Sequence, residues 1–264
     1  MEKVRCTVEV LTYNSEQTLG RCLESVKDFD DIIVLDGNST DQTRKIAKQY
    51  HARIVPQRET NKQNIRIEHF ADVRNKGIAL AKHDWFLYID SDEYLSQAAV
   101  EEIRGIIARG KDNIYFAYNL PRVPVVGKKI IDRLRPSYQV RFFYLPAVEG
   151  FIKRIHERIT IKIGYQVGTL LNPEYVPLED ISVLQEKWSG YIDMQLQDIV
   201  ITPKILFLKT SANIKKFFKY WVKYAIGLVR RPRSRLPFWY EYHNAAYHLR
   251  IVWRLWRLYI TKKI

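Results

Sequence analysis

Short apolar runs alternate with amphipathic segments along the first part of this chain of 264 residues. The apolar runs are rich in β-branched residues, which favours strands, and the segments between them carry apolar residues at helical spacing. Strands that alternate with helices form a parallel sheet with right-handed crossovers. We therefore predict an α/β fold in which the carboxyl ends of the strands meet at one edge. In order, the expected elements are strand 8–14, helix 15–26, strand 32–36, helix 42–50, strand 52–55, helix 73–82 and strand 85–90.

Polar side chains stand where three of these strands end. Thr12 closes the first, Asp36 closes the second, and Asp90-Ser91-Asp92 follows the last. Ligands of open α/β sheets bind outside the carboxyl ends of the strands. Two carboxylates that are two residues apart suit a hard cation bridging a diphosphate. The alternative for Asp90 and Asp92 is a solvated acidic turn that caps the next helix.

The chain lacks the two glycine-rich loops that commonly cradle nucleotide phosphates, since neither G-x-G-x-x-G nor G-x-x-x-x-G-K-[ST] follows the first strand. Arg74 lies at the start of the helix that leads into the Asp90 strand. A helix start and a guanidinium both favour an anion, so Arg74 is a candidate contact of the nucleotide. An ordinary surface arginine is the alternative.

Four motifs occur in order along the first hundred residues: Thr12-Tyr13-Asn14, the segment 35–41, the segment 73–77 and the segment 88–93. Together they resemble the family 2 inverting glycosyltransferases with the GT-A fold, and among these the bacterial enzymes that add sugars to the lipopolysaccharide core. The resemblance covers residues 4–105 well and residues 137–160 more loosely. The family often has Ser-Gly-Ser-Thr or Asp-Gly-Ser after its second strand, where this chain has Gly37-Asn38-Ser39.

The resemblance implies a metal-dependent transfer of a sugar from a nucleoside-diphosphate sugar, UDP-sugar above all, to a glycan or lipid-linked acceptor such as lipopolysaccharide core. Thr12 and Asn14 would line the nucleotide pocket, and Asp36 would accept a hydrogen bond from the base. Arg74 would sit beside the nucleotide. Asp90 would touch the ribose or the metal, and Asp92 would be the firmer ligand of Mg²⁺ or Mn²⁺ on the diphosphate.

An inverting transfer also needs a base that takes the proton of the acceptor hydroxyl. Glu157 is the first candidate, with His156 as a further metal ligand, whereas an ion pair of Glu157 with a neighbouring arginine is the plain alternative. Glu179 and Asp180 are the rival candidates for the base, because relatives use a Glu-Asp pair before a helix for this step. That pair equally suits the start of a helix.

The positive charge of the chain is concentrated at one end. The 43 Lys and Arg residues exceed the 29 Asp and Glu residues by 14. Residues 201–264 carry 15 basic residues and one acid, Glu241, whereas residues 1–200 carry 28 of each sign. We therefore expect a catalytic domain over 1–200, with a donor half of about 1–110 and an acceptor half of about 111–200, followed by a basic, aromatic-rich helical tail over 201–264. A loop or turn is expected over 121–137.

The tail predicts two amphipathic helices. The first, around 214–228, has lysines opposite an apolar stripe, and the second, around 244–260, is mostly apolar with one stripe of arginines, Arg250, Arg254 and Arg257. Such helices favour an anionic membrane surface contacted through residues 212–264. Packing on the catalytic domain or a homo-oligomer are alternatives, and nucleic acid is disfavoured because the aromatic residues lie on helix faces. Two cysteines, no leading apolar segment and no long apolar run indicate a cytoplasmic, membrane-peripheral protein. The competing function is a non-catalytic membrane-surface adaptor with a nucleotide-binding fold.

Overall fold

The computed structural model describes residues 2–131, 137–154, 156–178, 180–196, 199–230 and 236–261. The chain divides into two compact units, the first made of 1–125 and 135–177 and the second of 126–134 and 178–264. The division thus falls after residue 177, whereas the sequence suggested residue 200. The difference arises because helix α5 (Ile181–Leu196) packs on helix α7 (Phe238–Thr261) and belongs with the tail.

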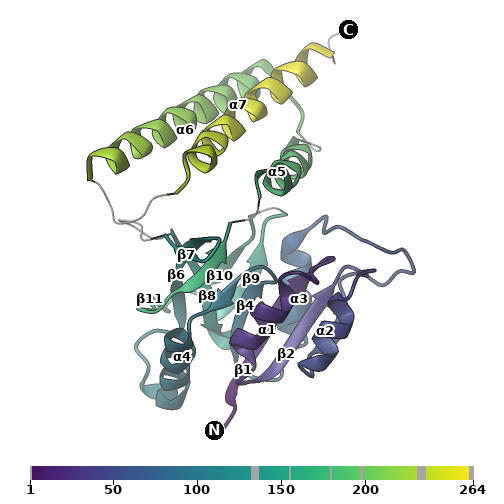
Figure 1. Ribbon diagram of the computed structural model, residues 1–264, viewed down its shortest axis with the longest axis vertical. Helices are drawn as coiled ribbons and strands as arrows, with labels where there is room; N and C mark the ends of the chain where they lie inside the picture. Colours follow the sequence, from purple (N-terminus) through teal and green to yellow (C-terminus); the bar gives the residue numbers. More distant parts are fainter. Residues whose placement is uncertain are drawn as a thin grey trace. The chain divides into compact units, whose positions relative to one another are not determined.

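The first unit is built on a mixed sheet with the strand order β3-β2-β1-β4-β8-β6-β12-β5 (Figure 1). Strands β3, β2, β1 and β4 are parallel, as predicted, and β8 joins β4 in the antiparallel sense. A separate pair of strands, β9 and β10, is antiparallel. The bounds are β1 Val4–Thr12, β2 Phe29–Asp36, β3 Arg53–Pro56, β4 Trp85–Asp90, β5 Tyr94–Leu95, β6 Ala117–Val126, β8 Ser137–Tyr144, β9 Val148–Ile152, β10 Arg158–Ile161, β11 Val167–Thr169 and β12 Glu174–Pro177.

Both faces of the sheet are covered, because successive residues of a strand point to opposite faces. On β1, Val8 and Val10 pack with helix α1 (Leu19–Val26) and helix α4 (Gln97–Arg109). The other face carries Leu11 of β1 and Tyr88 of β4, where helix α3 (Phe70–Ala79) and β9 pack. The remaining helix of this unit is α2 (Thr43–Gln49). Residues 9, 88 and 90 therefore share the α3 side of the sheet.

The helices follow the apolar spacing of the sequence closely. In α1, the buried residues are Leu19, Cys22, Leu23 and Val26, which recur at helical spacing in the sequence. Helix α4 begins at a capping serine, whose Ser96 Oγ accepts a hydrogen bond from Ala99 N at 3.1 Å. Both cysteines are buried and reduced, as expected for small core residues.

The expected loop over 121–137 is wrong for its first part. Strand β6 continues through Pro121 and Pro124 to Val126 and is followed by a turn in which Gly127 has a φ of 58°. Prolines cannot donate to a ladder, but β8 on one side and β12 on the other hold the strand extended. A short strand, β7 (Lys129–Ile130), comes next, and residues 132–136 lie outside the described part of the chain.

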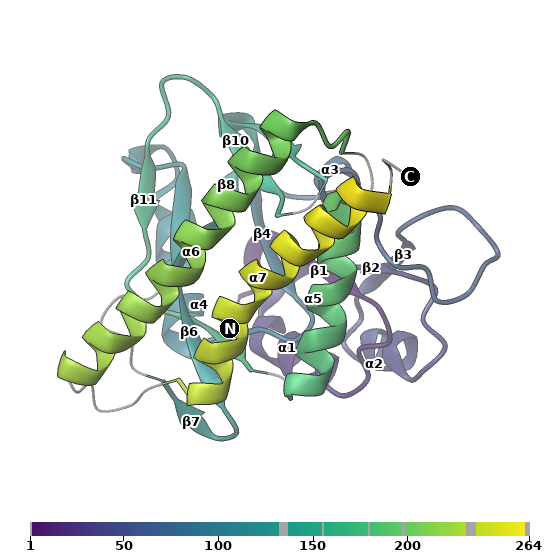
Figure 2. The ribbon, with the colours of Figure 1, turned by 90° about the horizontal axis from the view of Figure 1, so that it is seen from above.

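The second unit contains α5 and a helical hairpin of α6 (Pro203–Arg230) and α7. Figures 1 and 2 both show α6, in green, alongside α7, in yellow. Each helix is longer than the sequence pattern predicted, since α6 begins about ten residues before 214 and α7 begins at Phe238. A small core of Ile192, Leu196, Leu206, Ile251 and Leu255 joins the three helices. No helix within the described residues combines the length and the apolarity needed to cross a membrane.

Candidate active site

The ends of β1 and β2 are joined by a buried polar cluster. Thr12 Oγ1 donates to Asp36 Oδ1 at 3.0 Å, and the Asp36 side chain is only 2% exposed. The second partner of Asp36 is Ser39, whose backbone N and Oγ donate to it at 3.0 and 2.6 Å. Gln57 closes the cluster, because its Nε2 donates to the carbonyls of Thr12 and Leu35, each at 3.0 Å. Asp36 thus shapes the loop at this sheet edge.

The structure accounts for the residues of the turn Gly37-Asn38-Ser39, in which this chain differs from the usual motif. A side chain on Gly37 would place its Cβ 2.5 Å from the carbonyl oxygen of Ile65, so the turn needs glycine there. Asn38 has a left-handed backbone with φ 53°, which asparagine tolerates. Its Nδ2 donates to the carbonyls of Thr60 and Lys62 at 2.9 and 2.8 Å. The turn therefore fastens the long connection between β3 and α3 over the edge.

Asn14 is part of the same fastening. Its backbone N donates to Ser39 Oγ at 2.9 Å, and its Oδ1 accepts from Thr40 N at 3.0 Å. Its Nδ2 donates to Asn64 Oδ1 at 3.0 Å. The structure therefore places Thr12, Asn14 and Asp36 together, and their polar groups bind one another and the surrounding loops.

Arg74 is the centre of the second cluster, on the α3 side of the sheet. Its side chain is 1% exposed, so it is not the surface arginine of the alternative interpretation. Its Nη1 contacts Glu9 Oε1 at 2.8 Å, its Nε contacts Glu157 Oε1 at 3.4 Å, and its Nη2 donates to Asp90 Oδ1. The guanidinium lies over the Tyr88 ring, 4.6 Å from its centroid. One cation thus gathers carboxylates from three separate segments.

The residues beside Arg74 explain how segments so far apart in sequence meet. Asn75 Oδ1 accepts from Phe151 N at 2.8 Å, and its Nδ2 donates to the Phe151 carbonyl at 3.0 Å. These two hydrogen bonds tie α3 to β9, the strand that precedes Glu157 in the chain. A Cβ on Gly77 would lie 1.6 Å from Glu9 Oε2, so glycine makes room for the buried acid. Residues of the motif 73–77 therefore bring β9 and the buried acid Glu9 next to Arg74.

A second arginine, Arg141 of β8, holds the other side of Asp90. Its Nη2 lies 3.1 Å from Asp90 Oδ2 and 2.9 Å from Glu93 Oε2, and it also lies over the Tyr88 ring. Asp90 therefore has one arginine at each oxygen, while its side chain stays 39% exposed. Behind this contact, Arg122 pairs with Glu93 and, at 2.6 Å, with Glu174.

Burial and pairing shift the titration of these groups in opposite directions. Burial alone would raise the pKa of Asp90, but Arg141 and Arg74 hold it well below its usual range. Burial raises the pKa of Glu9 to about 7, because Arg74 only partly offsets the loss of water. The pKa of Glu174 likewise rises to about 7, again because it is buried. The exposed edge thus keeps a charged carboxylate, whereas the acids beneath it hold protons more readily.

Of the candidates for the base, Glu157 lies in this cluster. Its side chain is 13% exposed, and the partner that the structure gives it is Arg74. His156 is exposed and has a left-handed backbone, with φ 55°. Glu179 lies outside the described residues. Asp180 belongs to the second unit, directly before α5, where its carbonyl accepts from Leu184 N at 3.1 Å.

Asp90 and Asp92 are the residues that the sequence suggested as ligands of a divalent metal. Both Asp90 oxygens are paired with arginines, whereas Asp92 is half-buried beside it. Within the described residues, no group of three or more His, Cys, Asp and Glu side chains is arranged to hold a metal ion. Magnesium is commonly bound by one or two carboxylates, with water and substrate phosphate completing the shell. A pair of carboxylates, Asp90 and Asp92, is compatible with that mode.

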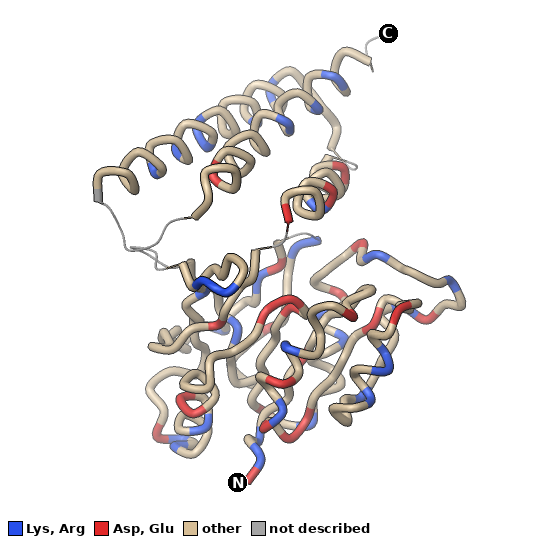
Figure 3. Tube along the Cα trace, viewed as in Figure 1, with Lys and Arg blue, Asp and Glu red and all other residues tan. Residues whose placement is uncertain are grey.

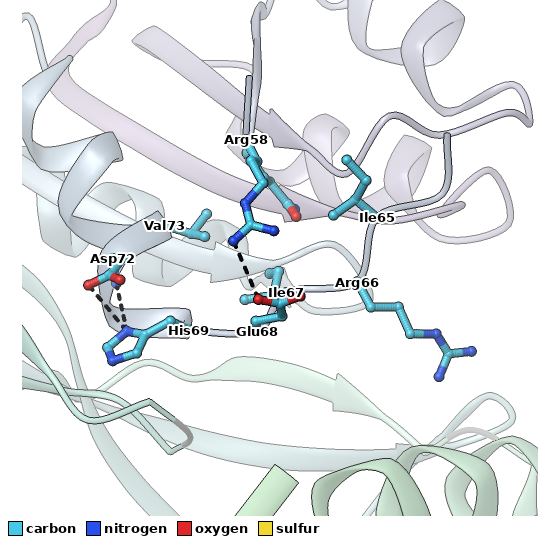
Figure 4. A pocket seen from close by; sticks show the side chains of 9 residues that line it. Arg58, Ile65, Arg66, Ile67, Glu68, His69, Asp72 and Val73 are labelled. Carbon is cyan, nitrogen blue, oxygen red and sulfur yellow. Dashed lines mark hydrogen bonds and ion pairs between the residues drawn. The ribbon is translucent and has the colours of Figure 1, made fainter. Parts of the chain in front are cut away.

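A pocket lies between the connection that follows β3 and the start of α3. Its walls include Ile65 and Val73, and the charged side chains of Arg58 and Glu68 reach toward each other there, with Asp72 and His69 paired at one side (Figure 4). Arg58 Nη2 donates to Glu68 Oε2 at 3.4 Å across this space. Gln57, which binds the Thr12 and Leu35 carbonyls, is also among the lining residues. The pocket therefore adjoins the Asp36 cluster.

Sequence reasoning missed five members of the buried network: Glu9, Glu93, Arg122, Arg141 and Glu174. A signal existed for Glu9, because an acid inside the apolar run Val8-Glu9-Val10-Leu11 must be paired when the strand is buried. No comparable signal marks Arg141, because polar and apolar residues alternate along Tyr138-Gln139-Val140-Arg141-Phe142, and this pattern predicts an exposed arginine.

This geometry agrees with what known proteins indicate. The sequence profile described as glycosyl transferase family 2 matches residues 7–163, which is more than half of the chain. The chain belongs to glycosyl transferase family 2, and its α/β sheet is of the nucleotide-binding type found there.

Among individual proteins, an uncharacterized glycosyltransferase of Rickettsia typhi is 34% identical over 112 residues, 42% of this chain and 36% of that protein. The poly(ribitol-phosphate) beta-glucosyltransferase of Bacillus spizizenii is 27% identical over 160 residues, 51% of this chain and 24% of that protein. The matches thus span well under half of these relatives. A crystal structure of S. aureus TarS residues 1–349 in complex with UDP-GlcNAc gives a TM-score of 0.49 at 15% identity, over 95% of this chain and 72% of that chain.

Proposed function

We propose that the protein is an inverting glycosyltransferase that takes a sugar from a nucleoside-diphosphate sugar, with a UDP-sugar as the expected donor. The observation that carries the proposal is the junction at Arg74, where Glu157 and Asp90 meet at the carboxyl edge of the sheet. Membership of glycosyl transferase family 2 supports it. So does the adjoining cluster of Thr12 and Asp36, which lies where a nucleotide would enter an open α/β sheet.

In this proposal the two carboxylates have different roles. Glu157 takes the proton of the acceptor hydroxyl as that oxygen attacks the sugar from the face opposite to the leaving diphosphate. Arg74 and Asn75 hold Glu157 in place, the first by contact and the second through β9. Asp90, fixed between two arginines, is a rigid acceptor at the sheet edge that would contact a ribose hydroxyl or the metal.

Mg²⁺ or Mn²⁺ would be held by Asp92, with Asp90 as the second carboxylate beside it. When bound, such an ion would stabilise the charge that grows on the leaving diphosphate. His156 as a further ligand stays a prediction, and so do the contacts of Asn14, Asp36 and Arg74 with the nucleotide. Asp36 and Arg74 are both buried, which supports a structural role. In that role, Asp36 would shape the loop at the sheet edge and Arg74 would hold the carboxylates around it.

The acceptor in this proposal is a glycan or a lipid-linked molecule, such as the lipopolysaccharide core suggested by the sequence. A cytoplasmic, membrane-peripheral location would give access to a lipid-linked acceptor. The basic tail supports that location, because its charge suits an anionic membrane surface. A homo-oligomer remains the alternative use of the tail.

The test is release of UDP from a panel of UDP-sugars, with water or a soluble glycan as acceptor, in the presence of Mn²⁺. We expect turnover with one donor and its loss in excess chelator. Asp92→Asn is the matched control, because it removes the charge of one ligand while keeping its shape. Nucleotide binding without turnover for any donor would instead support the non-catalytic membrane-surface adaptor.

A further inference from the structure

The hairpin of α6 and α7 exposes a row of large apolar side chains on each helix. Along α6 they recur at intervals of seven, four, four and seven residues, and along α7 at seven, four, three and four, so each row is a stripe on one side of its helix. Every one of these side chains is at least 38% exposed. We call the two rows together the apolar face: Phe207, Ile214, Phe218, Val222 and Val229 on α6, and Tyr242, Leu249, Trp253, Trp256 and Ile260 on α7.

The two rows lie on the same side of the hairpin. Trp221, which neighbours Phe218 on α6, contacts the ring of Tyr242 in the α7 row, with centroids 6.5 Å apart. Farther along, Trp256 Nε1 donates to Thr210 Oγ1 at 3.1 Å, so the other end of the α7 row also borders α6. The rows therefore flank a common seam and form one continuous surface.

The buried contacts of the hairpin are made by other residues. Between the helices, His248 Nδ1 lies 3.0 Å from Asn213 Oδ1, and both side chains are buried. Helix α5 contributes Ile192 and Leu196 to the shared core, and its Asp193 pairs with Arg254 at 3.1 Å. The apolar face thus lies outside the buried core of the unit, although Tyr242 and Trp256 at its border also contact α6.

Positive charge borders the apolar face. Lys215 and Lys219 are exposed on α6, one row away from Phe218. Figure 3 shows Lys and Arg in blue along α6 and α7. By sequence, Glu241 is the one acidic residue of these two helices. Aromatic and aliphatic side chains on one side and lysines beside them form the pattern of a helix that lies in a membrane interface.

We propose that the apolar face seats the protein on a membrane that contains anionic lipids. The ten side chains enter the boundary between headgroups and acyl chains, with the hairpin lying flat, while the bordering lysines contact lipid phosphates. Tryptophan and tyrosine suit this depth, because they combine an apolar ring with a polar group. The proposal rests on the membrane contact given under the proposed function and specifies the surface that makes it.

Charge favours a membrane over a second copy of the chain. A symmetric dimer through this face would bring the same lysine rows of two copies together, and the tail offers one acid to compensate. An anionic bilayer supplies the opposite charge for all of them.

The experiment measures flotation of the full chain with phosphatidylglycerol-containing and pure phosphatidylcholine vesicles. Phe218→Glu and Trp253→Glu place a charge in the apolar face. Leu208→Glu and Ile226→Glu are matched controls, because both are exposed apolar residues of α6, at 56% and 47%, in the row of Lys215 and Lys219. All four variants change the net charge equally. We expect the face variants to weaken vesicle binding about tenfold or more, and the controls much less.

A second readout reports depth directly. Bromine-labelled acyl chains should quench the tryptophan fluorescence of bound protein, and Trp253→Phe should reduce that quenching. Equal losses for face and control variants would show that only charge matters and would overturn the proposal. So would absence of flotation together with a stable dimer that Phe218→Glu dissociates. UDP release to a soluble acceptor, measured on the same variants, separates a failure of this surface from a failure of the sugar chemistry.

Discussion

Arg74 has a structural role in addition to the nucleotide contact that its sequence position suggested. Its position suggested a contact with a nucleotide, but the side chain is buried among Glu9, Asp90 and Glu157. A buried guanidinium is stable only when its donors are paired, so each carboxylate also depends on it. At the scale of single residues, the site is a set of mutually dependent charges, and two of those charges remain partly open to solvent.

Replacing Glu157 by Gln tests the proposed base. The amide keeps the shape but cannot accept a proton, so turnover should fall by about 10²- to 10⁴-fold. Binding of the donor nucleotide should change little. Steady-state rates and calorimetric titration with UDP measure the two effects. If the variant stays active while Glu179→Gln or Asp180→Asn does not, the base belongs to that pair.

Replacing Asp92 by Asn tests the metal. The variant should lose Mn²⁺-dependent strengthening of UDP binding, because a neutral amide is a poor ligand of a hard cation. Its thermal unfolding should match that of the native chain, since Asp92 is half-buried at the edge rather than in the core. The same metal effect on UDP affinity in both proteins would exclude Asp92 as a ligand.

Glu9 predicts a pH dependence of stability. Its pKa rises from 4.5 to about 7 on folding, so the folded protein binds a proton that the unfolded chain has lost. Stability from this group is present below about pH 4.5 and is lost as the pH rises through 7. Glu9→Gln resembles the protonated acid, so its stability relative to the native chain should increase over this range, by up to about 3 kcal/mol. Denaturant unfolding at several pH values measures the difference, and a constant difference would contradict the assignment.

At the scale of elements, the parallel strands could be predicted from the sequence, but the position of β9 beside α3 could not. The ends of β1, β2 and β4 follow from apolar runs that stop at polar residues, which is a local signal. The position of Glu157 depends on Asn75 binding Phe151, a contact between residues 76 apart in sequence. The Arg74-Asn75 pair was visible in the sequence, but its partners were not. Long-range pairing of this kind leaves no periodic trace.

Asn75→Ala should therefore impair catalysis from a distance. It leaves the backbone N and carbonyl of Phe151 without their partner, and β9 is then held less firmly. We expect a loss of about 1–3 kcal/mol in stability, a fall in turnover, and UDP affinity close to that of the native chain. Asn75→Asp keeps one acceptor and should be intermediate. Unchanged turnover in Asn75→Ala would show that β9 does not position Glu157.

At the scale of the molecule, the charge count and the packing of the helices divide the chain at different residues. The charge imbalance begins near residue 201, whereas α5 packs on α7 through Ile192 and Leu196 and so belongs to the second unit. Charge counts report the surface of a segment, and packing is decided by a few apolar residues. The family assignment rests on residues 7–163, so the tail is the part of the chain about which relatives say least.

This boundary makes a prediction about truncated chains. A chain ending at 200 keeps α5 without α7, which exposes Ile192 and Leu196, whereas a chain ending at 177 does not carry α5 at all. We expect the longer fragment to be the less soluble one. Size-exclusion chromatography and light scattering at matched concentrations measure this. Equal behaviour of the two fragments would show that α5 does not depend on the hairpin.

The contact between Gly77 and Glu9 links two positions that are far apart in sequence. The space that a Cβ would take at residue 77 is filled by the Glu9 carboxylate. A relative that carries alanine at the position of residue 77 should therefore carry a shorter side chain at the position of residue 9, and the arginine between them should lose its innermost partner. The two sites should vary together across the family, and a bacterial lineage that changes one should be found to have changed the other.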